Sequence, residues 1–112
     1  MTYTHKNTWN WGQTHTIVYW NGVGLVNVSV ENETPERATI HGVSVLPGYR
    51  KRGYGTTLLR LAEKEAKKMG CAWVELTTIK GGFEERWYRE HGYNDIPGED
   101  VDGMICLGKE LK

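Results

Sequence analysis

The pattern of apolar and polar positions in the first half of the chain is typical of β-strands. Three segments are predicted strands, namely residues 14–20, 23–31 and 37–46, and Val26, Val28 and Val30 fall on one face of the second. Asn21-Gly22 separates the first two and favours a type I′ turn, in which both central residues need positive φ. The pattern therefore predicts a β-hairpin followed by a third strand, and residues 2–9 are a candidate edge strand before it.

The second half of the chain changes to the 3.6-residue period of helices. From residue 54 to residue 69 an apolar stripe runs along one face, formed by Leu58, Leu59, Ala62, Ala66 and Met69. Gly70 follows as a C-terminal stop, because glycine adopts the left-handed conformation that ends many helices. A shorter helix is predicted over residues 83–91, and it ends at Gly92 in the same way.

Between the two helices, residues 71–78 are nearly apolar on both faces, apart from Glu75. A strand covered on both faces is typical of a β–α–β unit, so we expect it to run parallel to residues 37–46. Residues 93–96 and 103–110 then form a closing hairpin. The order predicts one domain over residues 1–112, of the α/β (α+β) class. Its mixed central sheet holds a β-α-β-α-β core, preceded by an N-terminal β-hairpin.

Composition excludes several partners. Fourteen Lys and Arg balance fourteen Asp and Glu, so no net charge favours nucleic acid or an anionic membrane surface. No apolar run approaches the length of a membrane span and the first residues do not resemble a signal sequence, so we expect a cytoplasmic protein. In that compartment Cys71 and Cys106 should be buried free thiols. No His/Cys spacing predicts a metal site.

A basic, glycine-rich segment lies where the third strand passes into the first helix. Arg50, Gly53 and Gly55 form the pattern Arg-x-x-Gly-x-Gly directly before that helix. The first helical N–H groups lack intrahelical partners and carry partial positive charge, and the glycines let an anion approach the backbone. Leu58 stands where a dinucleotide fingerprint needs a third small residue, and no Lys-Ser/Thr pair follows Gly53. We therefore predict a diphosphate-sized anion site at residues 50–56.

This loop in its strand–loop–helix context resembles the acetyl-CoA loop of the GCN5-related N-acetyltransferase (GNAT) family. The resemblance covers about residues 14–110. It implies acetyl-CoA as co-substrate, without a metal, lying between the two central parallel strands. It also implies which backbone groups bind the cofactor. Val45 and Leu46 would pair with the pantetheine amides, and the diphosphate would be held by the N–H groups of Arg52, Gly53, Tyr54, Gly55 and Thr56. The Thr56 hydroxyl either adds a bond to the diphosphate or caps the helix.

The resemblance also implies catalytic residues. Tyr88 stands four residues before a Gly-aromatic pair, where family members often carry the Tyr that protonates the departing thiolate. A phenol suits this task because it stays protonated at neutral pH. For the base that deprotonates the amine, His41, Glu75 and an ordered water remain open. Two positions depart from the family, since Gly81 and Glu84 replace an Asn and an Ala.

We therefore expect an acetyltransferase that moves an acetyl group to a primary amine, on a small molecule or on a protein or peptide. Family members usually carry two helices between their first and second strands, and about a dozen residues precede residue 14 here. The acceptor side should then be open, or completed by a second subunit of a homodimer. Two alternatives remain: a CoA-binding regulatory module without turnover, and a plain interaction domain that binds no nucleotide.

Overall fold

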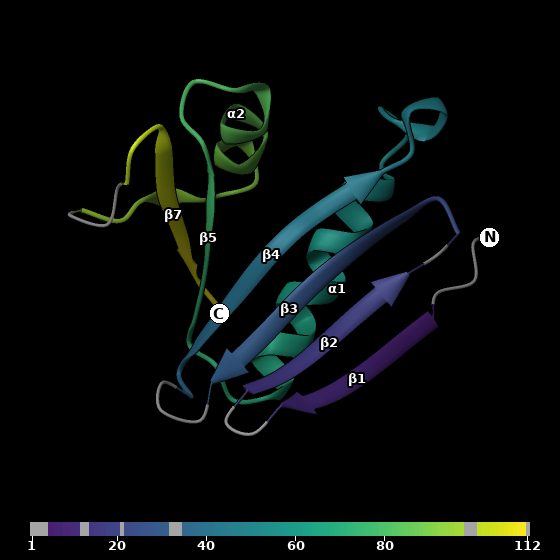
Figure 1. Ribbon diagram of the computed structural model, residues 1–112, viewed down its shortest axis with the longest axis vertical. Helices are drawn as coiled ribbons and strands as arrows, with labels where there is room; N and C mark the ends of the chain where they lie inside the picture. Colours follow the sequence, from purple (N-terminus) through teal and green to yellow (C-terminus); the bar gives the residue numbers. More distant parts are fainter. Residues whose placement is uncertain (1–4, 12–13, 21, 32–34, 98–100, 112) are drawn as a thin grey trace.

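The computed structural model describes residues 5–11, 14–20, 22–31, 35–97 and 101–111, and the side chains from residue 22 onward. Within these residues the chain forms seven strands and two α-helices, whose arrangement is drawn in Figure 1. In order they are β1 His5–Trp11, β2 Thr14–Trp20, β3 Gly24–Glu31, β4 Arg37–Val45, α1 Tyr54–Lys68, β5 Trp73–Ile79, α2 Phe83–Glu90, β6 Asn94–Asp95 and β7 Met104–Glu110. A single 3₁₀ turn, Pro47–Tyr49, lies between β4 and α1. The predicted order of elements is confirmed.

All seven strands belong to one mixed sheet with the order β1-β2-β3-β4-β5-β7-β6. Strands β1 to β4 form an antiparallel meander in which each strand pairs with the next along the chain. The predicted edge strand is present as β1, although it extends to Trp11, and residues 2–4 of that prediction lie outside the described residues. The closing hairpin is also present, with its first strand reduced to the two residues of β6.

The two central strands β4 and β5 run parallel, as predicted, but they are hydrogen-bonded to each other only at one end. Residues 37–39 pair with residues 73–75, and beyond them the strands separate (Figure 1). Along its other edge β5 pairs with β7 over all seven of its residues. Because β5 stays with β7, the separation leaves the second half of β4 without a neighbour on this edge of the sheet.

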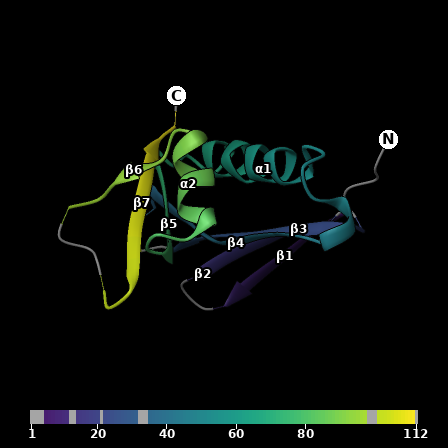
Figure 2. The ribbon, with the colours of Figure 1, turned by 90° about the horizontal axis from the view of Figure 1, so that it is seen from above.

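Both helices cover the same face of the sheet (Figure 2). Helix α1 lies across β3 and β4, and its predicted apolar stripe is buried there. Leu58, Leu59, Ala62 and Ala66 are fully buried against the inward face of these strands, which is formed by Val26, Val28, Ala38 and Ile40. Removing this much apolar surface from water is the main source of stability for a domain of this size. The core thus fixes the start of α1 relative to the end of β4.

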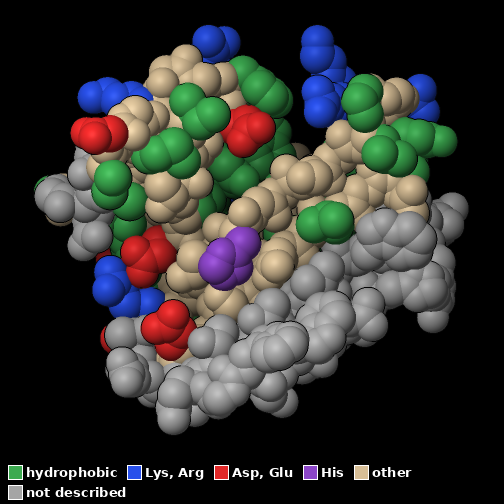
Figure 3. Space-filling model, viewed as in Figure 1, with side chains coloured by type: hydrophobic (Ala, Val, Ile, Leu, Met, Phe, Trp, Pro, Cys, Tyr) green, Lys and Arg blue, Asp and Glu red, His purple; other side chains and the backbone are tan. Residues whose placement is uncertain are grey.

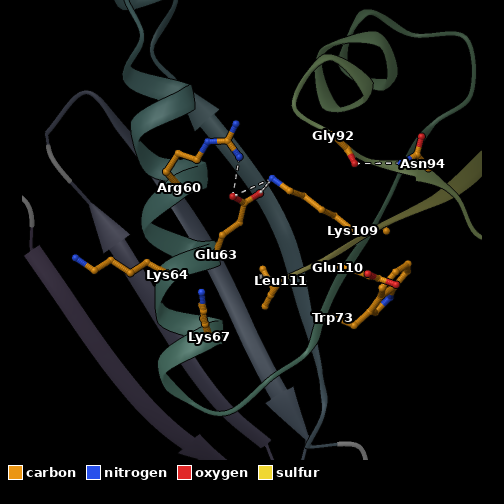
Figure 4. A pocket seen from close by; sticks show the side chains of 11 residues that line it. Arg60, Glu63, Lys64, Lys67, Trp73, Gly92, Asn94, Lys109, Glu110 and Leu111 are labelled. Carbon is orange, nitrogen blue, oxygen red and sulfur yellow. Dashed lines mark hydrogen bonds and ion pairs between the residues drawn. The ribbon is translucent and has the colours of Figure 1, made fainter.

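Beside the C-terminal half of α1 lies an open cavity of about 780 Å³. The Glu63 carboxylate lines this cavity, and Arg60 and Lys109 approach it from two sides (Figure 4). The ion pair with Arg60 measures 2.7 Å and that with Lys109 3.2 Å, and the Tyr93 hydroxyl donates a third bond of 2.7 Å. Since Glu63 is buried, these donors offset the cost of removing its charge from water. The cluster ties α1 to β7.

We expect Tyr93→Phe to lower the free energy of unfolding by about 2 kcal/mol, because the buried Glu63 carboxylate loses a hydrogen-bond donor. Burial, then the charge of Glu63, raises the pKa of Tyr93 above its usual value near 10. The unfolded chain therefore releases this proton at a lower pH than the folded chain does. The stabilising contribution of Tyr93 is complete below about pH 10 and is lost as the pH rises further.

The measurement is urea unfolding at about pH 8 and about pH 11 for the parent protein and the Phe variant. The parent should lose more stability on going to the alkaline condition. The stability of the Phe variant should still fall somewhat between these two pH values, because the pKa of Tyr88 is also raised, to about 12. Equal losses in both proteins would contradict the role given to the Tyr93–Glu63 bond.

The described residues also test the predictions made for the two cysteines, for membrane spans and for metal ligands. Cys71 is buried with its thiol directed to the Pro35 carbonyl, whereas Cys106 is only half-buried, and neither forms a disulfide. The predicted burial therefore holds for Cys71 and is wrong for Cys106. No described helix has the length and apolar character needed to cross a membrane. Within the same residues no three His, Cys, Asp or Glu side chains group as metal ligands would.

Candidate active site

The separation of β4 from β5 creates a cleft, which contains a cavity of about 590 Å³. Three parts of the chain line it: the end of β4, the loop that leads into α1, and one face of α2. On the helix-free face of the sheet, the surface is hollowed between β4 and the part that holds α2 (Figure 3). Hydrophobic side chains border this hollow. The cleft is open to solvent on this face.

The glycine-rich loop ends at one end of the cleft, and its backbone conformation exposes N–H groups. Lys51 and Gly53 have φ of 63° and 85°, and Gly53 is the N-cap of α1. The first helical hydrogen bond runs from the Thr57 N–H to the Gly53 carbonyl, and no described side chain caps the N-terminus. The N–H groups of the three residues before Thr57 thus precede the helical ladder. Both cavity-lining glycines, Gly53 and Gly55, belong to this segment.

Basic side chains surround these N–H groups. The Arg50 guanidinium folds back onto the end of β4, where its Nε donates to the Val45 carbonyl at 3.2 Å. Arg52 lies over the ring of Tyr49, 5.7 Å from its centroid, and Tyr49 contacts Tyr54 edge to face. These contacts hold two cations beside a helix N-terminus. Anions are stabilised at such a site by the helix dipole and the formal charges together.

Three of the predicted binding residues make contacts that sequence patterns did not indicate. Both backbone groups of Leu46 are used within the chain, since its N–H donates to Val23 and its carbonyl accepts from Tyr49. Gly55 lies against the indole of Trp87, where a Cβ atom would approach to 3.2 Å. The Thr56 hydroxyl lies 2.9 Å from Nε2 of His91, so it links α1 to the end of α2 instead of capping α1.

Tyr88 reaches the cleft from α2 and is buried. The Val43 N–H of β4 donates to its phenol oxygen, so the phenol lies against the backbone of the strand that borders the cleft. Burial, followed by the negative charge of Glu84, raises the pKa of Tyr88 to about 12, and the Val43 bond opposes this shift. The phenol therefore keeps its proton at neutral pH. Such a group can donate a proton but cannot serve as a base.

The two predicted bases lie outside the residues that line the cavity. His41 is the extra residue of a β-bulge, where the register between β3 and β4 shifts beside Val28. It is exposed, and its Nε2 lies 2.6 Å from the hydroxyl of Ser29. Glu75 is held by Arg37 at 3.0 Å, across the only part of β4 and β5 that is paired. The structure thus brings together Tyr88 and the glycine-rich loop, but neither base.

Several residues of the cleft could not be identified from the sequence. Val43 was missed because its contribution is a backbone N–H, which has no sequence signature. Trp87 was missed because an aromatic residue on a short helix is as typical of packing as of a site. Glu84 was noted as a departure from the family, yet its carboxylate lines the cavity one helical turn before Tyr88. A charged residue on an otherwise apolar helix stripe was the signal available for it.

Comparison with protein families matches residues 2–93 to the Acetyltransferase (GNAT) family. A search of curated proteins returned no match. Among solved structures, nourseothricin acetyltransferase is 22% identical with a TM-score of 0.71, covering 90% of this chain and 67% of that one. PaiA N-acetyltransferase from Thermoplasma acidophilum in complex with coenzyme A is 18% identical with a TM-score of 0.73, covering 88% and 61%. Ribosomal-protein-S18-alanine N-acetyltransferase from Escherichia coli is 20% identical with a TM-score of 0.69, covering 92% and 72%. At these identities the likeness shows the fold.

Proposed function

Because the chain belongs to the GNAT acetyltransferase family, whose members are acyl-CoA-dependent N-acetyltransferases, we propose a specific reaction for its cleft. An acetyl group moves from acetyl-CoA to a primary amine by direct attack, with both substrates bound at once. One observation carries this proposal: a single cleft holds an anion site of free helical N–H groups at one end and the Tyr88 phenol against β4 at the other.

The cofactor would lie along the separated edge of β4. Its diphosphate would accept hydrogen bonds from the N–H groups of residues 52–56, beside the cations of Arg50 and Arg52. The pantetheine would pair with the strand edge as an additional strand does, although fewer groups are available than the resemblance implied. Leu46 has both backbone groups in use, and the carbonyl of Val45 accepts from Arg50. No metal takes part in this proposal.

The reaction then requires one acid and one acceptor for the amine proton. The neutral amine forms the C–N bond at the thioester carbonyl, and the C–S bond breaks with its electron pair on sulfur. Tyr88 donates its proton to the thiolate, and the phenolate regains the proton that the acylated nitrogen releases. The proton lost earlier by the ammonium goes to solvent. The raised pKa keeps Tyr88 protonated until the thiolate forms, but it also makes the phenol a weaker acid toward that thiolate. The proton that the acylated nitrogen returns to the phenolate therefore completes the transfer.

Two side chains, Glu75 and His41, are candidates for the base that passes the ammonium proton to solvent, and they lie in different places. Glu75 forms an ion pair with Arg37 and does not line the cavity. His41 is exposed two residues from Val43 on β4, and its ring reaches Ser29 without lining the cavity. We propose that His41 acts on the ammonium through a water. The open face of the cleft favours an amine on a protein or peptide, or an acceptor side completed by a second subunit.

The proposal is tested by release of free CoA thiol from acetyl-CoA with a panel of primary amines and N-terminal peptides. We expect at least one acceptor to raise thiol release well above hydrolysis, with an acetylated product of matching mass. Binding of acetyl-CoA without consumption across the panel would instead support the regulatory-module alternative. Failure to bind acetyl-CoA would overturn the proposal.

A further inference from the structure

We propose that Glu84 binds the ammonium group of the acceptor and so selects a positively charged amine at the α2 wall of the cleft. This inference rests on the proposed acetyl transfer, and it names the acceptor class for that reaction. Glu84 would act as a positioning residue that holds the acceptor beside the thioester. Glu84 would hold the acceptor in its ammonium form on arrival, and the neutral amine attacks after that proton has passed to solvent. Glu84 is therefore distinct from the acid Tyr88 and from the base.

The placement of Glu84 supports this role. Its side chain lines the cavity together with Phe83, Trp87 and Tyr88, all on α2. It is exposed to the open cleft, and the described residues provide it with no hydrogen bond or ion pair. Its neighbour Glu85 differs in this respect, because it accepts from the Gly81 N–H at 2.7 Å and from Arg89 at 2.9 Å. Glu84 therefore presents an uncompensated carboxylate to whatever occupies the cleft.

The charges of the cleft are separated along its length. Arg50 and Lys51 line the loop end, where the cofactor phosphates would lie. Among the described residues that line the cavity, Glu84 is the only acidic one, and it comes from α2 instead of the loop. An anionic cofactor and a cationic acceptor would thus meet complementary charges at different positions. Charge complementarity of this kind fixes orientation and excludes uncharged competitors.

Apolar groups at the same end suggest what the ammonium is attached to. Phe83, next to Glu84, lines the cavity with 67% of its surface exposed, and Ile79 at the end of β5 is 65% exposed. The Ile79 carbonyl accepts from the Gly82 N–H, so the chain turns directly from the end of β5 into α2, which Phe83 begins. An ammonium carried on an apolar group would cover the Phe83 side chain while it pairs with Glu84.

The effect of Glu84 on Tyr88 supports their proximity. The groups that act on the phenol are the Glu84 charge from α2 and the Val43 N–H from β4, and the ring contacts Tyr93 edge to face. The negative charge of Glu84 raises the pKa of Tyr88, so removing that charge should lower the pKa. This consequence does not depend on any acceptor.

The test uses the complex with free CoA, which cannot transfer an acetyl group. Phenethylamine is titrated into this complex by calorimetry, with 2-phenylethanol as its uncharged analogue. We expect phenethylamine to bind more tightly than the alcohol, and Glu84→Gln to weaken its binding about ten-fold. The matched control is Glu90→Gln, an exposed carboxylate on the same helix outside the cavity lining, which should change nothing.

Equal affinity of the parent and Glu84→Gln for phenethylamine would overturn the inference, as would equal binding of the amine and the alcohol. Tighter CoA binding by Glu84→Gln without any effect on the amine would also overturn it, because the carboxylate would then act against the cofactor. An ultraviolet titration of tyrosinate, compared with Tyr88→Phe, should place the Tyr88 transition at lower pH in Glu84→Gln. Loss of CoA binding in the parent would instead be a failure of the proposed acetyl transfer.

Discussion

Tyr88→Phe should lower kcat about 100-fold while leaving the affinity for acetyl-CoA within a few-fold of the parent. The phenol is the only buried proton donor that lines the cleft in the described part of the chain, and its raised pKa keeps it protonated until the thiolate forms. Phenylalanine preserves the ring contacts with Trp87 and Tyr93. The substitution therefore removes the proton and little of the packing.

Two controls make the Tyr88 result specific. The Val43 N–H loses its acceptor in the variant, which should cost about 1 kcal/mol of stability, so unfolding must be measured alongside turnover. Tyr93→Phe is the matched substitution, because Tyr93 is equally buried but lies outside the cavity lining. It should retain most of the parent turnover. If Tyr88→Phe also retained it, Tyr88 would be a packing residue.

Gly53→Glu should reduce the affinity for acetyl-CoA by more than 100-fold, or about 3 kcal/mol. Gly53 lies at the N-terminus of α1 with φ of 85°, and a Cβ atom there would meet no other atom within 4 Å. A glutamate side chain could thus extend without a clash into the space next to the N–H groups that would bind the diphosphate. Its charge would both repel the phosphates and satisfy the helix N-terminus in their place.

The strain of a side chain at positive φ must be separated from this effect. Gly53→Ala carries the same strain, of about 1 kcal/mol, without the charge. We expect it to bind acetyl-CoA within about ten-fold of the parent, as measured by calorimetry. Equal losses for Ala and Glu would mean that only the loop conformation matters. Unchanged affinity of the Glu variant would remove the loop from the cofactor site.

Sequence periodicity predicted the helices and strands because they depend on local patterns. The buried stripe of α1 and the inward face of β3 follow directly from the spacing of Leu and Val residues. The Gly-rich loop could be recognised because three of its residues are close in the chain and have few alternative roles. The parallel pairing of β4 with β5 could also be predicted, because a nearly apolar strand that follows a helix is typical of a β–α–β unit.

Contacts between distant segments could not be predicted in this way. The bond between Tyr93 and Glu63 joins residues that are 30 positions apart, and the one between Thr56 and His91 joins residues 35 positions apart. No local pattern specifies such pairs. The bulge that exposes His41 depends on a one-residue excess in β4 against β3, which alternation alone does not show. The separation of β4 from β5, which forms the cleft, depends on the pairing of β5 with β7.

The most direct test of this account is a calorimetric titration of the protein with acetyl-CoA, with dephospho-CoA and ATP as controls. The account predicts selective binding of acetyl-CoA at micromolar concentration, about −8 kcal/mol, because the helical N–H groups and the edge of β4 act together. ATP lacks the pantetheine and should bind more weakly. Absence of acetyl-CoA binding, or equal binding of acetyl-CoA and ATP, would contradict the assignment of the cleft as the cofactor site.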